Sequence, residues 1–142
     1  MAIDDVTTSV QVEHQTVEAE KTSLGLDQNV TAALAYLFGV LSGIVVFLVE
    51  KEDEFVRFHA AQSIAVFGGL FVLSVGVGFL NLFLGLVIGG LLGGLLSLLF
   101  TLVWFATLFA GFVLWAYLLF KSYSGETPRI PIAAGIADSL VH

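Results

Sequence analysis

The sequence lacks cysteine altogether and has only two prolines, one methionine and five lysines and arginines among its 142 residues. Without cysteine the chain forms no disulfide and no thiolate metal site. Twelve acidic residues outnumber the five basic ones and give a formal charge of −7. Because nucleic-acid binding needs a basic patch, this balance excludes nucleic acid as a partner.

Charge of either sign is scarce, since only 12% of the residues are charged. A soluble domain is about a quarter charged, because its surface must face water. In their place stand long apolar runs: residues 60–120 hold no charged side chain and no histidine, and neither do residues 28–49. Runs of about 18 or more apolar residues indicate membrane spans. The sequence therefore predicts an all-α integral membrane protein embedded in a lipid bilayer.

Three transmembrane helices are expected in a domain of residues 28–121, at about 30–49, 56–80 and 98–120. Residues 81–97 are rich in glycine, and a helix running from 85 to 120 would be about 54 Å long, which exceeds one ordinary span. We therefore expect a Gly-rich hairpin around Asn81–Gly94 before the last helix. A four-helix arrangement is the alternative.

The two ends of the chain differ from the apolar middle. Residues 1–27 are polar and acidic, which predicts a disordered tail. Residues 122–142 contain Pro128 and Pro131, after which Ile132, Ile136 and Leu140 recur every four residues. This spacing predicts a short interfacial helix in a cytoplasmic tail.

The basic residues indicate an orientation in the cell membrane. With three spans, Lys51, Arg57, Lys121 and Arg129 share one side and Lys21 lies on the other. Cytoplasmic segments carry an excess of lysine and arginine. The sequence therefore predicts a multi-pass protein with its N-terminus outside and its C-terminus in the cytoplasm.

Polar side chains gather at the start of the second expected span, in the segment EKEDEFVRFHAAQS. Ionisable residues at a membrane boundary are candidates for function, because each is costly unless paired or solvated. Arg57 lies one helical turn after Asp53 and Glu54, at spacings that permit ion pairs. We define the boundary cluster as Glu50, Asp53, Glu54, Arg57, His59 and Gln62. A proton relay or headgroup site is one interpretation, and a snorkelling arginine with interfacial hydrogen bonds is the other.

Small residues recur every four positions in two of the apolar runs. Such spacing lets helix backbones approach closely, so we expect helix packing there. The predicted packing residues are Gly39, Gly43, Gly85, Gly89 and Gly93. Aromatic and basic residues suited to the membrane interface follow near the C-terminal end. The predicted interfacial anchors are Trp115, Tyr117, Lys121 and Arg129.

Three segments together resemble a known family: LDQNVTAALAYLFGVLSGIVVFLVEKE, EDEFVRFHAAQSI and KSYSGETPRIPIAAGIAD. The family comprises small archaeal and bacterial multi-spanning membrane proteins of unknown function. It is described as distantly similar to the membrane subunit of the chloroplast inner-envelope protein import (Tic) translocon. The resemblance covers Leu26 to Asp138 and implies a compact helical membrane domain, but it supplies no activity.

Two functions are consistent with these patterns. The first is a structural or accessory membrane protein that binds other membrane proteins or forms a homo-oligomer. The alternative is an oligomeric transport or protein-translocation component, in which Arg57, His59, Gln62 and Asn81 line a hydrated path. The sequence shows no catalytic constellation, so we expect no enzymatic activity, no cofactor and no metal.

Overall fold

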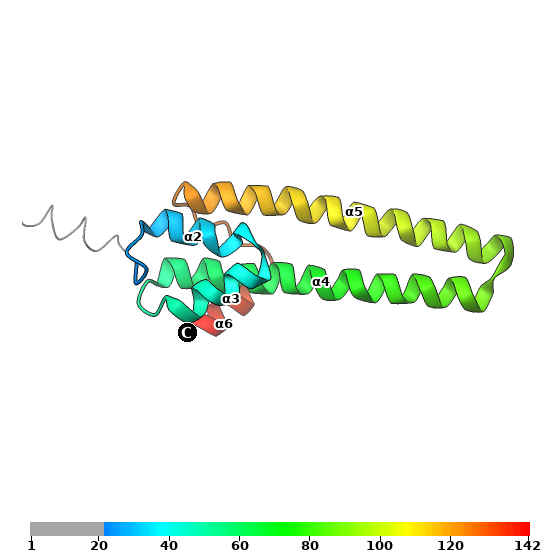
Figure 1. The fold of residues 1–142 in the computed structure, drawn as a ribbon, viewed down its shortest axis with the longest axis horizontal. Helices are drawn as coiled ribbons and strands as arrows, with labels where there is room; N and C mark the ends of the chain where they lie inside the picture. Colours follow the sequence, from blue (N-terminus) through cyan, green and yellow to red (C-terminus); the bar gives the residue numbers. More distant parts are fainter. Residues whose placement is uncertain (1–21) are drawn as a thin grey trace, which may run out of the picture.

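The computed structural model describes residues 22–142 and is built from helices, as expected. Three short helices are α2 (Gln28–Leu37), α3 (Val40–Val49) and α6 (Ala133–Val141), and two long ones are α4 (Glu54–Ile88) and α5 (Gly90–Tyr123). The long pair forms a narrow hairpin, and the short helices gather at the end where α4 begins and α5 finishes (Figure 1). We call this end the near end and the opposite turn the far end.

The long helices are the only two in the described part of the chain with the length and apolarity to cross a membrane. Their most apolar stretches bury no residue inside the protein, so they present their side chains to the surroundings. At 1.5 Å per residue, the 35 residues of α4 extend about 52 Å.

The first expected span is not a single helix. Residues 30–49 are divided between α2 and α3, ten residues each, which lie side by side as a hairpin (Figure 1). The break falls at Gly39, whose φ of 60° is reached easily only without a side chain. Ser42 holds the turn, since its hydroxyl accepts from the Phe38 N–H at 2.9 Å and donates to the Ala35 carbonyl at 3.1 Å.

The far-end turn is also tighter than the sequence suggested. Residues 81–88 and 90–94 are helical, and the reversal takes place at Gly89 and Gly90, with φ of 60° and 58°. The expected Gly-rich hairpin is therefore a single-residue link between two long helices. The helices expected at 56–80 and 98–120 extend over 54–88 and 90–123. The four-helix alternative is wrong, because residues 81–88 and 90–97 belong to these two helices and form no separate one.

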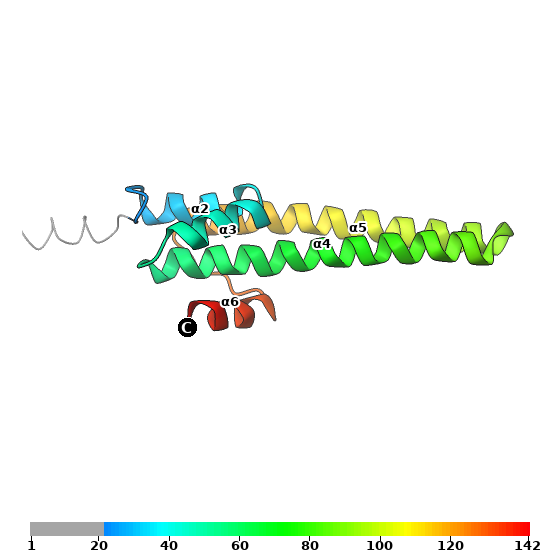
Figure 2. The same ribbon diagram turned by 60° about the horizontal axis from the view of Figure 1, so that its bottom comes forward.

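The buried core lies at the near end. Every buried residue of α4 falls between Val56 and Val66, where α2 and α3 pack on one side and α6 on the other (Figure 2). Small side chains make this packing close: Ala134 and Ala137 of α6 contact Phe58 and Ala61 of α4. The apolar stripe expected on the C-terminal helix points away from this core, because Ile132, Ile136 and Leu140 are all exposed.

The end of the expected acidic tail is packed in the structure. Thr22 is buried and shares a hydrogen bond of 3.0 Å with Thr31, so residues 22–27 belong to the near end. The rest of the expected tail, residues 1–21, lies outside the described part of the chain.

Candidate functional site

The boundary cluster separates into three groups with different partners. Arg57 makes none of the ion pairs expected with Asp53 and Glu54. Its guanidinium donates instead to the carbonyl oxygens of Glu50, at 2.6 Å, and Phe47, at 3.2 Å, and stacks on the Phe47 ring. A cation at the C-terminal end of a helix is favoured by the dipole, and Arg57 thereby closes the end of α3. Asp53 caps α4 by accepting from the Val56 N–H at 3.1 Å.

Glu50 ties the segment before α2 to the loop before α4. Its side chain is fully buried, and it accepts hydrogen bonds from the Ser23 N–H and hydroxyl at 2.7 and 2.8 Å. The N–H groups of Glu52 and Asp53 donate to it as well, both at 3.1 Å. Burial alone would raise the pKa of Glu50, but these donors stabilise the carboxylate and hold its pKa below the ordinary value. Glu54 is exposed at the start of α4.

The third group is a buried polar chain between α2, α4 and the segment before α6. His59 and Gln62 are fully buried one turn apart on α4, and Tyr36 reaches both from α2. The Tyr36 hydroxyl lies 2.9 Å from His59 Nδ1 and accepts a hydrogen bond from Gln62 Nε2 at 3.1 Å. We call these three residues the polar clamp.

The clamp holds the C-terminal segment by its backbone. His59 Nε2 lies 3.1 Å from the Glu126 carbonyl, and Gln62 Nε2 donates to the Pro128 carbonyl at 2.9 Å. The Ile130 N–H donates to Gln62 Oε1 at 3.1 Å. All three contacts join residues 66–68 positions apart in the sequence.

The pattern of donors fixes the hydrogen positions in the clamp. A carbonyl only accepts, so His59 Nε2 carries the hydrogen and Nδ1 of the neutral ring accepts from the Tyr36 hydroxyl. That hydroxyl accepts in turn from Gln62. The polar atoms of the clamp are thus satisfied within the protein, which is the arrangement of a structural network rather than of an open reactive site.

The predicted anchors also have partners at the near end. Trp115 is half-buried, and its indole N–H donates to the Tyr36 carbonyl at 2.9 Å, which joins α5 to α2. Lys121 pairs with Glu126 at 2.8 Å and lies over the ring of the exposed Tyr117. Arg129 pairs with Asp138 of α6 and stacks on Phe58.

The five glycines expected to pack helices have different surroundings. A Cβ at Gly43 would lie 3.1 Å from the Ala60 carbonyl oxygen, so α3 meets α4 there by close approach. Gly39 faces Phe67 and forms the α2–α3 turn. Gly89 forms the far-end turn, and Gly93 lies against Ile88 just beyond it. Nothing lies within 4 Å of a Cβ built at Gly85, so no neighbour in the described residues packs there.

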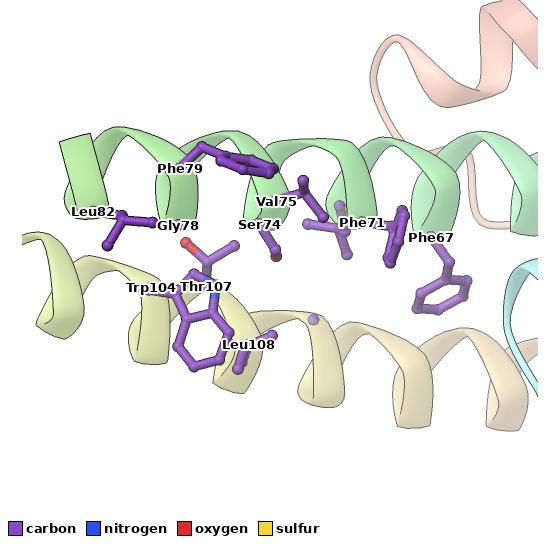
Figure 3. Close-up of a pocket in the computed structure, with 12 residues that line it drawn as sticks. Phe67, Phe71, Ser74, Val75, Gly78, Phe79, Leu82, Trp104, Thr107 and Leu108 are labelled. Atoms are coloured by element: carbon purple, nitrogen blue, oxygen red, sulfur yellow. The ribbon is translucent and has the colours of Figure 1, made fainter.

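An apolar groove runs between the long helices beyond the core (Figure 3). Its volume is about 680 Å³, and its lining is mainly apolar, with the hydroxyls of Ser74 and Thr107 and the indole N–H of Trp104 as its polar side-chain groups. At its near-end limit Gly111 of α5 lies against Leu70 of α4. Toward the far end, Asn81 donates to the Thr101 hydroxyl at 3.1 Å, while its buried Oδ1 atom has no hydrogen-bond partner within residues 22–142. The sequence did not indicate this groove.

Sequence reasoning missed Tyr36, Ser23 and the role of Trp115. Each acts through a partner distant in the sequence: Tyr36 and Trp115, for example, are 79 positions apart. Among residues 22–142, no three histidine, aspartate or glutamate side chains come together as a metal site would require.

Comparison with known proteins places the chain in a family. The sequence profile of the MamF/MmsF family, described as a magnetosome magnetite crystal formation protein family, matches residues 27–137. The chain belongs to this family. The match begins at the N-cap of α2 and ends within α6, so it includes the polar clamp and both long helices.

Archaeal relatives cover nearly the same region. A UPF0132 membrane protein of Methanocaldococcus jannaschii is 44% identical over 118 residues, which is 83% of this chain and 92% of the relative. A UPF0132 membrane protein of Archaeoglobus fulgidus is 31% identical over 82% of this chain and 97% of its own length. No solved structure matches the chain. The protein is therefore a membrane protein with archaeal relatives, as the sequence segments indicated, and nothing in these comparisons bears on the similarity to the Tic translocon.

Proposed function

We propose that this protein is a non-enzymatic accessory membrane protein that binds another transmembrane helix in the groove between α4 and α5. The observation that carries this proposal is the contrast between its two halves. At the near end the polar side chains are occupied by internal hydrogen bonds, whereas the long helices expose an apolar groove in which residues 22–142 place nothing.

The lining of the groove suits a helix. Gly78 leaves the backbone of α4 accessible, and Ser74 and Thr107 offer hydroxyls in a mainly apolar wall. Membrane helices associate through small residues and interhelical hydrogen bonds, because lipid and leucine side chains are equally apolar. The bound helix can come from a second copy or from another membrane protein. The name that the archaeal relatives carry, membrane protein, supports a role at a membrane for this chain as well.

The test is photo-crosslinking in native membranes with a photoreactive residue at Val75, which lines the groove. The matched control carries the same residue at the exposed Phe109, outside the groove. We expect protein adducts from position 75 and lipid adducts alone from position 109. Lipid adducts alone from both positions would show that no helix occupies the groove.

We further propose a topology of two spans and one re-entrant hairpin. The sequence interpretation placed residue 27 and residue 122 on opposite sides of the membrane. In the structure a Cβ at Gly125 would lie 3.2 Å from Asn29, so these segments lie together at the near end. Lys51, Arg57, Lys121 and Arg129 are at this end as well, which by the positive-inside rule makes it cytoplasmic. Residues 22–29 and the C-terminus then share the cytoplasmic side.

Introduced cysteines test this topology directly, because the natural chain has none. Asp27→Cys and Ser124→Cys lie at the near end and Leu91→Cys beside the far-end turn, and all three side chains are exposed. With intact cells and a membrane-impermeant maleimide, we expect labelling at position 91 alone. Labelling of position 27 together with position 91 would restore the three-span arrangement.

The alternative function, an oligomeric transport or protein-translocation component, is favoured by one observation. The unpaired Oδ1 of Asn81 is suited to a donor from another chain or from water. However, Asn81 lies 19 residues beyond Gln62 on α4, about 28 Å at 1.5 Å per residue. Because this distance separates the two polar sites on one helix, a hydrated path that joins them needs several copies of the chain. The similarity to the Tic translocon would fit this alternative. A pH-dependent flux in reconstituted vesicles that His59→Ala abolishes would support it.

A further inference from the structure

The two halves of the molecule differ in cross-section. At the near end α2 and α3 pack on one side of α4 and α6 on another, with α5 beside them (Figure 2). The α2–α3 turn reaches the level of Phe67, because a Cβ at Gly39 would lie 3.5 Å from that ring. Beyond this level the described chain consists of α4 and α5 alone. Five helices therefore occupy one half and two the other.

The short helices have surfaces suited to lipid. On α3, Leu41, Val45 and Leu48 are 73%, 59% and 60% exposed, and neither α2 nor α3 contains a charged residue. The stripe of α6 is similar, with Ile132 84% exposed at its start. The one charged side chain of α6, Asp138, is paired with Arg129. Exposed apolar faces of this extent are stable in a bilayer and costly in water.

The dimensions place these helices in one leaflet. A bilayer with its headgroups is about 45 Å thick, so the ~52 Å of α4 crosses it at a tilt of roughly 30°. From Glu54 to Phe67 α4 rises about 20 Å, which is close to half of that thickness. Helices of ten residues extend only about 15 Å and cannot cross.

We propose that the protein is wedge-shaped and prefers a curved bilayer. The leaflet that holds α2, α3 and α6 is the convex one. Three additional helices of about 10 Å diameter add roughly 240 Å² to that leaflet. A leaflet that gains area relative to its partner bends outward, and membrane insertion of amphipathic helices is sensitive to curvature for this reason. The inference rests on the proposed two-span topology and not on any helix bound in the groove.

The experiment measures orientation in vesicles of two sizes. Full-length protein with Ser124→Cys is reconstituted into zwitterionic lipid, in vesicles of about 50 and about 400 nm diameter. An impermeant maleimide reports the fraction of molecules whose near end faces outward. We expect the outward-to-inward ratio to be at least twofold higher in the small vesicles. Because charge effects on insertion are the same at both diameters, the size dependence isolates shape.

A second variant tests the origin of the effect. Removing residues 132–142 takes away α6, and we expect the size dependence to decrease toward equal ratios. If the full-length chain gives the same ratio at both diameters, the wedge is refuted, whether or not the truncated chain folds. Crosslinking at Val75 is independent of this result, so failure of the groove proposal and failure of the wedge are distinguishable.

Discussion

Gln62 is the residue whose loss should most clearly separate the C-terminal segment from the membrane helices. It is fully buried and makes three hydrogen bonds, two of them with the backbone of Pro128 and Ile130. Gln62→Ala leaves one carbonyl and one N–H without partners. Each unsatisfied buried group costs about 1–3 kcal/mol, and because Pro128 and Ile130 are only half-buried we expect a total loss of about 2–4 kcal/mol.

The matched control is Gln28→Ala. Gln28 is half-buried and makes one side-chain bond, to Asp53 at 3.0 Å, so its loss should cost less than about 1 kcal/mol. Unfolding by denaturing detergent in mixed micelles, followed by the fluorescence of Trp104 and Trp115, measures both variants.

A local readout distinguishes detachment of α6 from general loosening. Ala134 is buried against α4, so a cysteine at position 134 should be protected in the natural background and labelled in Gln62→Ala. Two results together would refute this reasoning: Gln62→Ala loses no more stability than Gln28→Ala, and position 134 stays protected. The polar clamp would then not hold the C-terminal segment.

Two further predictions concern the other contacts of the near end. Because hydrogen bonds hold the pKa of Glu50 below its ordinary value in the folded protein, its contribution to stability is present above the unfolded pKa and is lost as the pH falls through the folded value. Glu50→Gln should therefore flatten the loss of stability below about pH 5 in acid titrations, and an unchanged slope would assign that loss to another group. Gly43→Ala should destabilise by about 1–3 kcal/mol, because its Cβ would meet the Ala60 carbonyl at 3.1 Å. Gly135→Ala on α6, where nothing lies within 4 Å, should be neutral or slightly stabilising in the same unfolding assay, and equal effects at both positions would contradict close packing of α3 on α4.

The parts of the fold that depend on apolar length were predictable from the sequence. A charge-free run across residues 60–120 dictates helices in lipid, because only a helix satisfies its backbone there. The break at Gly39 was missed because twenty apolar residues suit a span whether or not one of them is a glycine. The sequence held one indication of the break. Ser42 follows soon after Gly39, and its hydroxyl can accept the Phe38 N–H that the break leaves without a helical partner.

The candidate site was predictable as a location but not as a set of contacts. Arg57, His59 and Gln62 stood out because polar groups are costly in such a chain. Their partners did not, since Arg57 bonds to backbone carbonyls and Gln62 to residues 66–68 positions away. Backbone partners carry no signature of residue type, so a single sequence offers nothing from which to infer them.

The polar clamp and the unequal cross-section of the molecule are physically linked. α6 buries only small side chains against α4, namely Ala133, Ala134 and Ala137, and such contacts bury little apolar area. The segment 126–130 therefore holds α6 beside α4, chiefly by its backbone bonds to His59 and Gln62 and also by Arg129, which pairs with Asp138 and stacks on Phe58. If the clamp opens, α6 is free to leave the wide half of the wedge. Gln62→Ala should then lower the size dependence of orientation in vesicles nearly as far as removal of residues 132–142 does. Full retention of that dependence in a variant with position 134 labelled would show that α6 contributes nothing to the wedge and that α2 and α3 alone create it.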